Sequence, residues 1–133
     1  AQARWTEISD YLNAGVENYA YWNMILNETG ESAWNWKQNG LINIDRNNST
    51  VTYNPDYAVM YLVSKYICPG DVRIGHFTTG EPTSIVLKNA KGNYTLVMQN
   101  DAETDKIISV QIGKGEIQMV KIPALALAAV VLE

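Results

Sequence analysis

The segment from Tyr19 to Asn39 concentrates side chains that suit the binding of a sugar. It holds three tryptophans and several amides, among them Trp22, Asn23, Trp34, Asn35 and Trp36. The flat face of an indole can cover the C–H side of a pyranose while its N–H donates a hydrogen bond. An asparagine amide offers both a donor and an acceptor to hydroxyl groups. These residue types indicate the rim of a sugar-binding site.

A strand and the loop after it are expected to position these side chains. The run Tyr19–Leu26 is almost continuously apolar and aromatic, which predicts a strand buried on both faces, as in a parallel sheet covered by helices. Ligands of parallel α/β folds bind at the carboxyl ends of the strands, so the polar loop that begins at Asn27 is expected to face the site. Periodicity alone nevertheless favours Trp22 as an ordinary core residue.

The chain divides near Cys68–Pro69–Gly70 into a part with helices and a part with strands only. Apolar spacing predicts a helix over Ala3–Asn13, and Asn54–Pro55 is a typical start for a second helix ending near Ile67. A hairpin of Leu41–Asp45 and Val51–Tyr53 is expected before this helix. Short strands separated by turns predict an antiparallel sandwich from Ser84–Lys88, Tyr94–Gln99, Lys106–Ile112, Glu116–Ile122 and Ala126–Leu132.

These landmarks resemble the C-terminal part of glycoside hydrolase family 30, the group that includes glucosylceramidases and endo-β-1,6-glucanases. The resemblance covers nearly the whole chain and rests on Tyr11–Gly15, Tyr21–Asn23, Trp34–Asn39, Tyr53–Pro55 with Tyr57–Tyr61, and Pro69–Gly70. It implies an α+β fold class, with the last βα elements of a (β/α)8 TIM barrel over residues 1–68. An antiparallel β-sandwich domain is expected over residues 69–133.

The resemblance also implies roles for the aromatic and amide residues. It places Trp22 in the subsite for the sugar that is cleaved and Asn35 near the same pocket. Asn23 follows Trp22 directly and is expected to contact the substrate with it. Trp34 and Trp36 stay open between pocket wall and loop packing, and Trp5 is expected in the core or an interface.

No catalytic residue is assigned. Family members retain configuration with two glutamates, a mechanism that needs carboxylates roughly 5 Å apart. The resemblance places both upstream of Ala1. Glu7 follows Thr6 as the family's nucleophile can follow a threonine, but it lies in the predicted first helix and is interpreted as a solvated helical carboxylate. The chain alone is therefore expected to be inactive, as a portion of a retaining β-glycosidase that binds a β-linked glycan or glycoside.

The alternative is a stand-alone, non-catalytic carbohydrate-binding or structural β-sandwich module. A lone barrel strand would leave an open backbone edge and apolar faces. The chain is therefore expected to pair with a missing N-terminal barrel portion. If it exists alone, self-association through Tyr19–Leu26 is expected instead.

Composition argues against other partners. The chain has 10 basic and 14 acidic residues, a net charge of −4 and no cluster of Lys and Arg, which argues against nucleic acid. The single cysteine, Cys68, is expected to pack at a helix end, and His76, the one histidine, lies in a predicted strand, so neither a metal site nor a cofactor is assigned. The apolar Ala124–Leu132 is too short for a membrane span, which needs roughly 20 residues. The resemblance implies a secreted or periplasmic parent.

Overall fold

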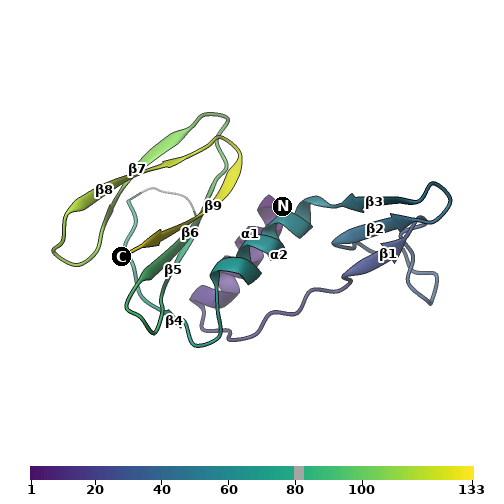
Figure 1. Ribbon diagram of the computed structural model, residues 1–133, viewed down its shortest axis with the longest axis horizontal. Helices are drawn as coiled ribbons and strands as arrows, with labels where there is room; N and C mark the ends of the chain where they lie inside the picture. The colour runs from purple at the N-terminus through teal and green to yellow at the C-terminus, as the bar shows by residue number, and fades with distance from the viewer. Residues whose placement is uncertain (80–82) are drawn as a thin grey trace.

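The computed structural model describes residues 1–79 and 83–133, which form two helices and three sheets (Figure 1). The helices are α1, Gln2–Asn13, and α2, Pro55–Tyr66. The strands are β1, Ile25–Asn27; β2, Ile42–Asp45; β3, Thr50–Tyr53; β4, Val72–Arg73; β5, Ser84–Lys88; β6, Tyr94–Asn100; β7, Lys106–Gln111; β8, Ile117–Ile122; and β9, Ala126–Leu132. The protein is thus an α+β fold in which most strand pairs are antiparallel.

Both predicted helices are confirmed. Trp5 and Ile8 are buried on α1, and Leu12 packs beside them, so a spacing of three and four residues gives the helix one apolar face. The α2 helix begins with Pro55 at its first position, where the missing N–H costs nothing. The Asn54 side chain does not cap this helix and donates instead to the Gly40 carbonyl oxygen at 2.7 Å.

The strands after residue 83 form a four-stranded sheet and a two-stranded ribbon. The sheet order is β4-β5-β6-β9, and β7 pairs with β8 in the ribbon. The five strands predicted for this region are confirmed to within one residue at each end. This arrangement is compatible with the expected β-sandwich.

Two apolar cores lie on the two faces of the four-stranded sheet, so β6 is buried on both sides. On one face Val97 and Ile85 pack against Trp5 of α1. On the other face Leu96 and Met98 pack against the ribbon. Helices, sheet and ribbon therefore form three successive layers (Figure 1). The boundary between residues 1–68 and 69–133 stays a prediction, and residues from both sides of it share the first core.

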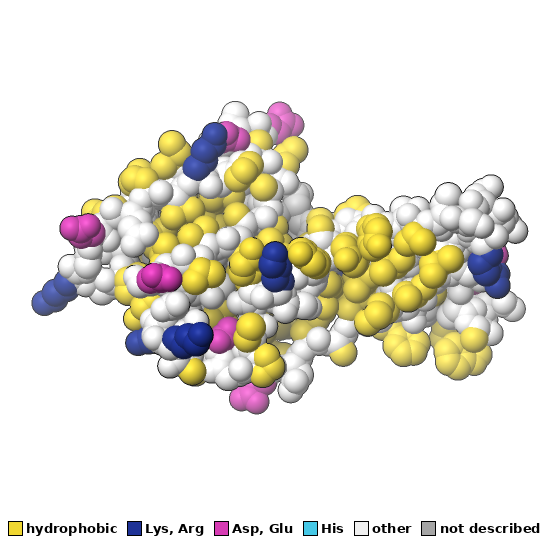
Figure 2. All heavy atoms as spheres, viewed as in Figure 1, with side chains coloured by type: hydrophobic (Ala, Val, Ile, Leu, Met, Phe, Trp, Pro, Cys, Tyr) yellow, Lys and Arg dark blue, Asp and Glu magenta, His cyan; other side chains and the backbone are white. Residues whose placement is uncertain are grey.

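Strands β1, β2 and β3 form an arm that extends away from the layered body (Figure 1). β1 and β2 are parallel, with Ile25 opposite Ile42, and the predicted β2–β3 hairpin is confirmed, with Ile42 opposite Tyr53. Figure 2 shows hydrophobic side chains along this arm and at its junction with the helices. The expected barrel fragment is not confirmed by this three-stranded sheet.

The prediction of a strand over Tyr19–Leu26, buried on both faces, is wrong for most of its length. Only Ile25 and Leu26 belong to β1, and Met24 and Ile25 are exposed. No strand in the described ranges lies beside residues 19–22, so no ladder of hydrogen bonds holds them in a sheet. Apolar composition favoured a buried strand, but burial depends on neighbours that the local sequence does not reveal.

Two smaller expectations are also corrected. His76 lies outside the strands, and its Nε2 is 2.8 Å from the Ser84 Oγ. Cys68 follows α2 but is exposed instead of packed, and its backbone N–H donates to the Asp71 carboxylate at 2.8 Å in a surface turn. Neither described helix is long and apolar enough to cross a bilayer.

Candidate sugar-binding site

Trp22 and Asn23 meet at a shared glutamine just before β1. The Trp22 Nε1–H donates to the Gln38 Oε1 at 3.3 Å, and the Asn23 side-chain amide donates to the same oxygen. The Asn23 backbone also pairs with Asn39 and Leu41, at 3.3 and 3.0 Å. Trp22 is 69% exposed and is not a core residue. The indole is therefore anchored at its polar edge, with apolar surface open to a ligand.

Asn35 lies at the tip of the loop between β1 and β2, with an indole on each side. Its φ of 59° is in the left-handed region, which asparagine adopts more readily than most residues. Trp34 and Trp36 are each 65% exposed, and their ring centroids are 6.1 Å apart with the planes tilted by 37°. The two indoles contact each other at the surface, so both loop packing and sugar contact stay open as their roles.

The loop folds back on itself and connects the two groups of aromatics. Glu31 and Lys37 form a bridge, and the Gln38 N–H donates to the Gly30 carbonyl oxygen at 2.9 Å. Gln38 thus lies at the base of a short hairpin whose tip carries Asn35. None of the contacts described for residues 1–79 and 83–133 joins the tip indoles directly to Trp22.

Gln38, which contacts both Trp22 and Asn23, is a residue of the candidate site that sequence reasoning did not single out. Its signal was present, because it belongs to the Trp34–Asn39 landmark and its amide has the hydrogen-bonding capacity of the asparagines. The sequence pattern did not reveal the short hairpin that brings Gln38 beside Trp22.

An open hollow of about 420 Å³ lies beside Trp22 and is lined by Arg4, Glu7, Tyr11, Val16, Asn18, Tyr19, Ala20, Tyr21 and Trp22. Arg4 is the positively charged residue of this lining. It donates to the Tyr19 hydroxyl at 2.8 Å and to the Asp56 Oδ2 at 3.1 Å. Arg4 also pairs with Glu7, so Glu7 is a partnered carboxylate instead of a simply solvated one. This network fixes the start of the segment that leads to Trp22.

The charges of Arg4 and Asp56 are stable over the ordinary pH range. Burial alone would lower the pKa of Arg4, but its hydrogen bonds to Asp56 and Tyr19 outweigh burial and raise the pKa. Burial would likewise raise the pKa of Asp56, but the Arg4 guanidinium holds it below its usual value. Burial raises the pKa of Tyr19, so its phenol stays protonated. Arg4, Asp56 and Tyr19 therefore orient the chain and do not supply a titrating acid or base.

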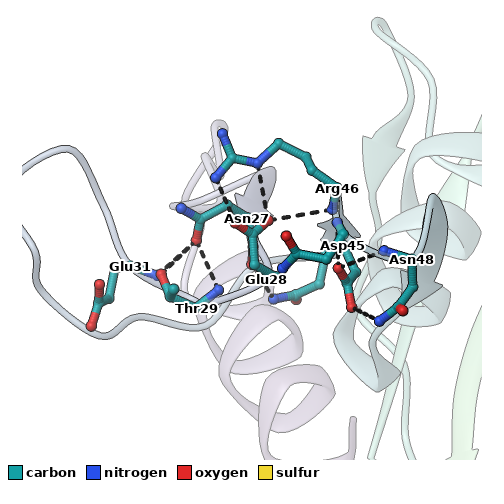
Figure 3. Close-up of polar contacts among 9 residues, drawn as sticks. Asn27, Glu28, Thr29, Glu31, Asp45, Arg46 and Asn48 are labelled. Carbon is teal, nitrogen blue, oxygen red and sulfur yellow. Dashed lines mark hydrogen bonds and ion pairs between the residues drawn. The ribbon is translucent and has the colours of Figure 1, made fainter.

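A second polar cluster lies at the carboxyl ends of the parallel strands β1 and β2 (Figure 3). Glu28 accepts two hydrogen bonds from the Arg46 guanidinium, at 2.6 and 3.0 Å. These bonds lower the pKa of Glu28 to about 2. Asn27 organises the same loop by accepting from the Thr29 backbone and hydroxyl, at 3.1 and 2.8 Å. Glu28 is therefore ionised and has no proton to donate as a general acid.

We expect Glu28→Gln to destabilise the protein in a pH-dependent way. A carboxylate with a depressed folded-state pKa contributes stability above its ordinary pKa and loses it as the pH falls through the folded value. The difference in free energy of unfolding between the two proteins should be constant above pH 5. It should shrink between the ordinary pKa of 4.5 and the folded value of about 2. Urea unfolding at pH 6 and pH 2.5 measures this, and an equal difference at both pH values would contradict the ion-pair account.

The described residues contain no group of three or more His, Cys, Asp and Glu that could hold a metal ion. The site is instead made of indoles, amides and fixed ion pairs. These groups can bind a neutral, hydroxyl-rich ligand by stacking and hydrogen bonding.

The fold is shared with proteins that include a carbohydrate-active enzyme. SrfJ from Salmonella typhimurium superposes with a TM-score of 0.86 and 16% identity, over 98% of this chain and 29% of that protein. The endo-β1,6-glucanase BT3312 superposes with a TM-score of 0.79 and 22% identity, over 93% of this chain and 29% of the glucanase. No protein-family model and no curated protein matches the sequence.

At these levels of identity the likeness is one of fold. The chain spans less than a third of the length of either protein, 29% in both cases.

Proposed function

We propose that this chain is the sugar-binding portion of a retaining β-glycosidase of the family 30 type and that it lacks both catalytic glutamates. The exposed Trp22, tied through Gln38 to Asn23, carries this proposal. The fold shared with an endo-β1,6-glucanase supports a β-linked glycan as the ligand. In the whole enzyme, two carboxylates outside this chain would form and hydrolyse a glycosyl-enzyme intermediate.

In this proposal the indole side chains stack on sugar rings and the amide side chains form hydrogen bonds with sugar hydroxyls. The open face of Trp22 covers the C–H side of a pyranose ring in the cleaved-sugar subsite, while Gln38 holds the indole in place. Asn23 and Asn35 offer amide groups to sugar hydroxyls. Trp34 and Trp36, paired at the loop tip, provide a second stacking surface for sugar units further along the glycan.

Replacing Trp22 by alanine is expected to weaken the binding of β-1,6-linked gluco-oligosaccharides by about tenfold or more, because a stacked aromatic is a typical hot-spot residue. Chemical-shift titration of the purified chain measures the dissociation constant. Phe77→Ala is the matched control, because Phe77 is an exposed aromatic outside the site. Equal affinity of the Trp22 variant and the unmodified chain would remove the central support for the proposal.

The purified chain is expected to hydrolyse an activated aryl β-glycoside no faster than a buffer blank. The glutamates that the structure ties to arginine, Glu7 and Glu28, are held in ion pairs, and Glu28 is ionised down to a pH of about 2. Release of the aryl group, followed by absorbance, measures the rate. Turnover above the blank that is lost in a Glu28→Gln variant would mean that the chain has a catalytic carboxylate after all.

A further inference from the structure

Asn54 is the single residue between β3 and α2, where the arm joins the helices (Figure 1). It occupies the N-cap position of α2, at which asparagine, aspartate and serine stabilise a helix about equally by accepting a hydrogen bond from its first turn. The Asn54 side chain makes no such bond. Its Nδ2 donates instead to the Gly40 carbonyl oxygen at 2.7 Å and to the Asn43 Oδ1 at 2.5 Å. The residue therefore acts through its donors, which a helix cap does not need.

The neighbours of Asn54 determine which way its amide points. The Gly40 carbonyl oxygen can only accept a hydrogen bond. Asn43 presents its Oδ1 to Asn54 because its own Nδ2 donates to the Asn27 carbonyl oxygen at 3.2 Å. Both partners of Asn54 are thus acceptors, so this position requires an NH2 group with two donor hydrogens. Among the residues that favour the N-cap position, asparagine alone supplies such a group.

The carbonyl group held in this way belongs to Gly40, two positions after Gln38 in the chain. The Gln38 Oε1 accepts hydrogen bonds from the side chains of Trp22 and Asn23. Gly40 is buried, and a Cβ atom at this position would lie only 3.1 Å from the Leu26 Cγ, so the backbone here packs tightly against β1. Because the connection is so short, a displacement of the Gly40 carbonyl would also displace Gln38.

We propose that Asn54 is a positioning residue of the sugar site, which keeps Gln38 in contact with Trp22 and Asn23. The Asn54 backbone strengthens this hold, because its N–H donates to the Leu41 carbonyl oxygen at 2.9 Å. The start of α2 thus binds two successive carbonyl groups of the segment that follows Gln38. This role rests on the proposed function, since it orients the indole and the amide that would contact the sugar.

Replacing Asn54 by aspartate tests this role, because aspartate keeps a capping oxygen and removes both donors. We expect Asn54→Asp to weaken the binding of β-1,6-linked gluco-oligosaccharides about threefold to tenfold, the effect of one lost hydrogen bond. Chemical-shift titration measures the dissociation constant, and circular dichroism should show unchanged helicity. Asn54→Ser removes the amide without adding a charge and should act in the same direction. Asn47→Asp, in the turn between β2 and β3, is the control that makes the same chemical change at an exposed side chain.

The resonance of the Trp22 indole N–H gives a readout that helix capping alone would not move. A hydrogen-bonded N–H resonates downfield, so this signal should move upfield in both Asn54 variants and stay in place in Asn47→Asp. A Trp22→Phe variant identifies the signal by its absence. An unchanged signal in both Asn54 variants would overturn the positioning role, as would an unchanged affinity where the unmodified chain binds the sugar. If the unmodified chain bound no oligosaccharide, the proposed function would fail, and an upfield shift would still support the positioning of Gln38.

Discussion

Replacing Trp5 by alanine is expected to lower the free energy of unfolding by about 3–5 kcal/mol, the usual cost of removing a buried tryptophan. Trp5 is 1% exposed and lies between α1 and the four-stranded sheet, where it contacts the core that contains Ile85 and Val97. Its Nε1–H donates to the Thr83 carbonyl oxygen at 3.0 Å. The substitution therefore removes both apolar contact across two layers and the hydrogen bond that fixes them.

Urea unfolding followed by circular dichroism measures this loss. Trp5→Phe separates the two contributions, because it keeps much of the apolar volume but removes the indole donor, while the Thr83 carbonyl oxygen still accepts the Gln99 N–H at 3.2 Å. Loss of this one hydrogen bond should cost about 0.5–1.5 kcal/mol. Asp10→Ala, an exposed position on the same helix, should change stability by no more than about 0.5 kcal/mol. A Trp5→Ala loss no larger than that of Asp10→Ala would mean that the helix does not pack on the sheet as described.

The elements with strong local signals were predicted from the sequence. The spacing of Trp5, Ile8 and Leu12 specifies one apolar helical face, and Asn54–Pro55 marks the start of α2, whatever the rest of the chain does. The strands after residue 83 were found because turn residues separate them at short intervals. These signals come from residues that are close together in the sequence, so they can be identified without the structure.

Burial on both faces could not be assigned in the same way. The sequence suggested Tyr19–Leu26 for this role, yet the strand buried on both faces is β6, Tyr94–Asn100, which includes the buried polar residues Gln99 and Asn100. An aromatic run is buried only where other elements cover it, and for residues 19–22 the described chain supplies Arg4 and Asp56 on one side. Composition measures the tendency of a segment to be buried, but it does not identify the elements that would pack over it.

The roles of the candidate site residues stay predictions, and the sequence could indicate only part of their geometry. Residue chemistry was enough to single out Trp22 and Asn23, whose mutual position follows from adjacency in the chain. Gln38 reaches them from 15 and 16 residues further along, and Arg4 reaches Asp56 across 52. Such contacts depend on how the loop folds back and on how the two helices pack together, so the structure was needed to find them.

A second large effect is expected at the end of β6, where Asn100→Asp should cost about 3–5 kcal/mol, the penalty for leaving an uncompensated buried charge. The Asn100 side-chain amide is fully buried and donates to the carbonyl oxygens of Thr104 and Pro123, both at 2.9 Å. Its Oδ1 accepts the Ala102 N–H at 3.1 Å. One side chain thus joins the start of the β6–β7 loop to the end of β8. An aspartate would turn an oxygen toward those carbonyls in place of the donor.

The pH dependence of this variant distinguishes a buried charge from the loss of the amide donor alone. Burial and the facing carbonyl oxygens raise the pKa of a carboxyl group above its ordinary value of about 3.9. The folded variant therefore binds its proton more tightly than the unfolded chain, so its deficit in stability should be smallest below that value and grow as the pH rises toward 7. Chemical unfolding at pH 3 and pH 7 measures the deficit, with the exposed Asn39→Asp as the same chemical change without burial. A deficit that does not grow with pH would contradict the burial of this side chain, because the carboxyl group would then have the same pKa in the folded and unfolded chains.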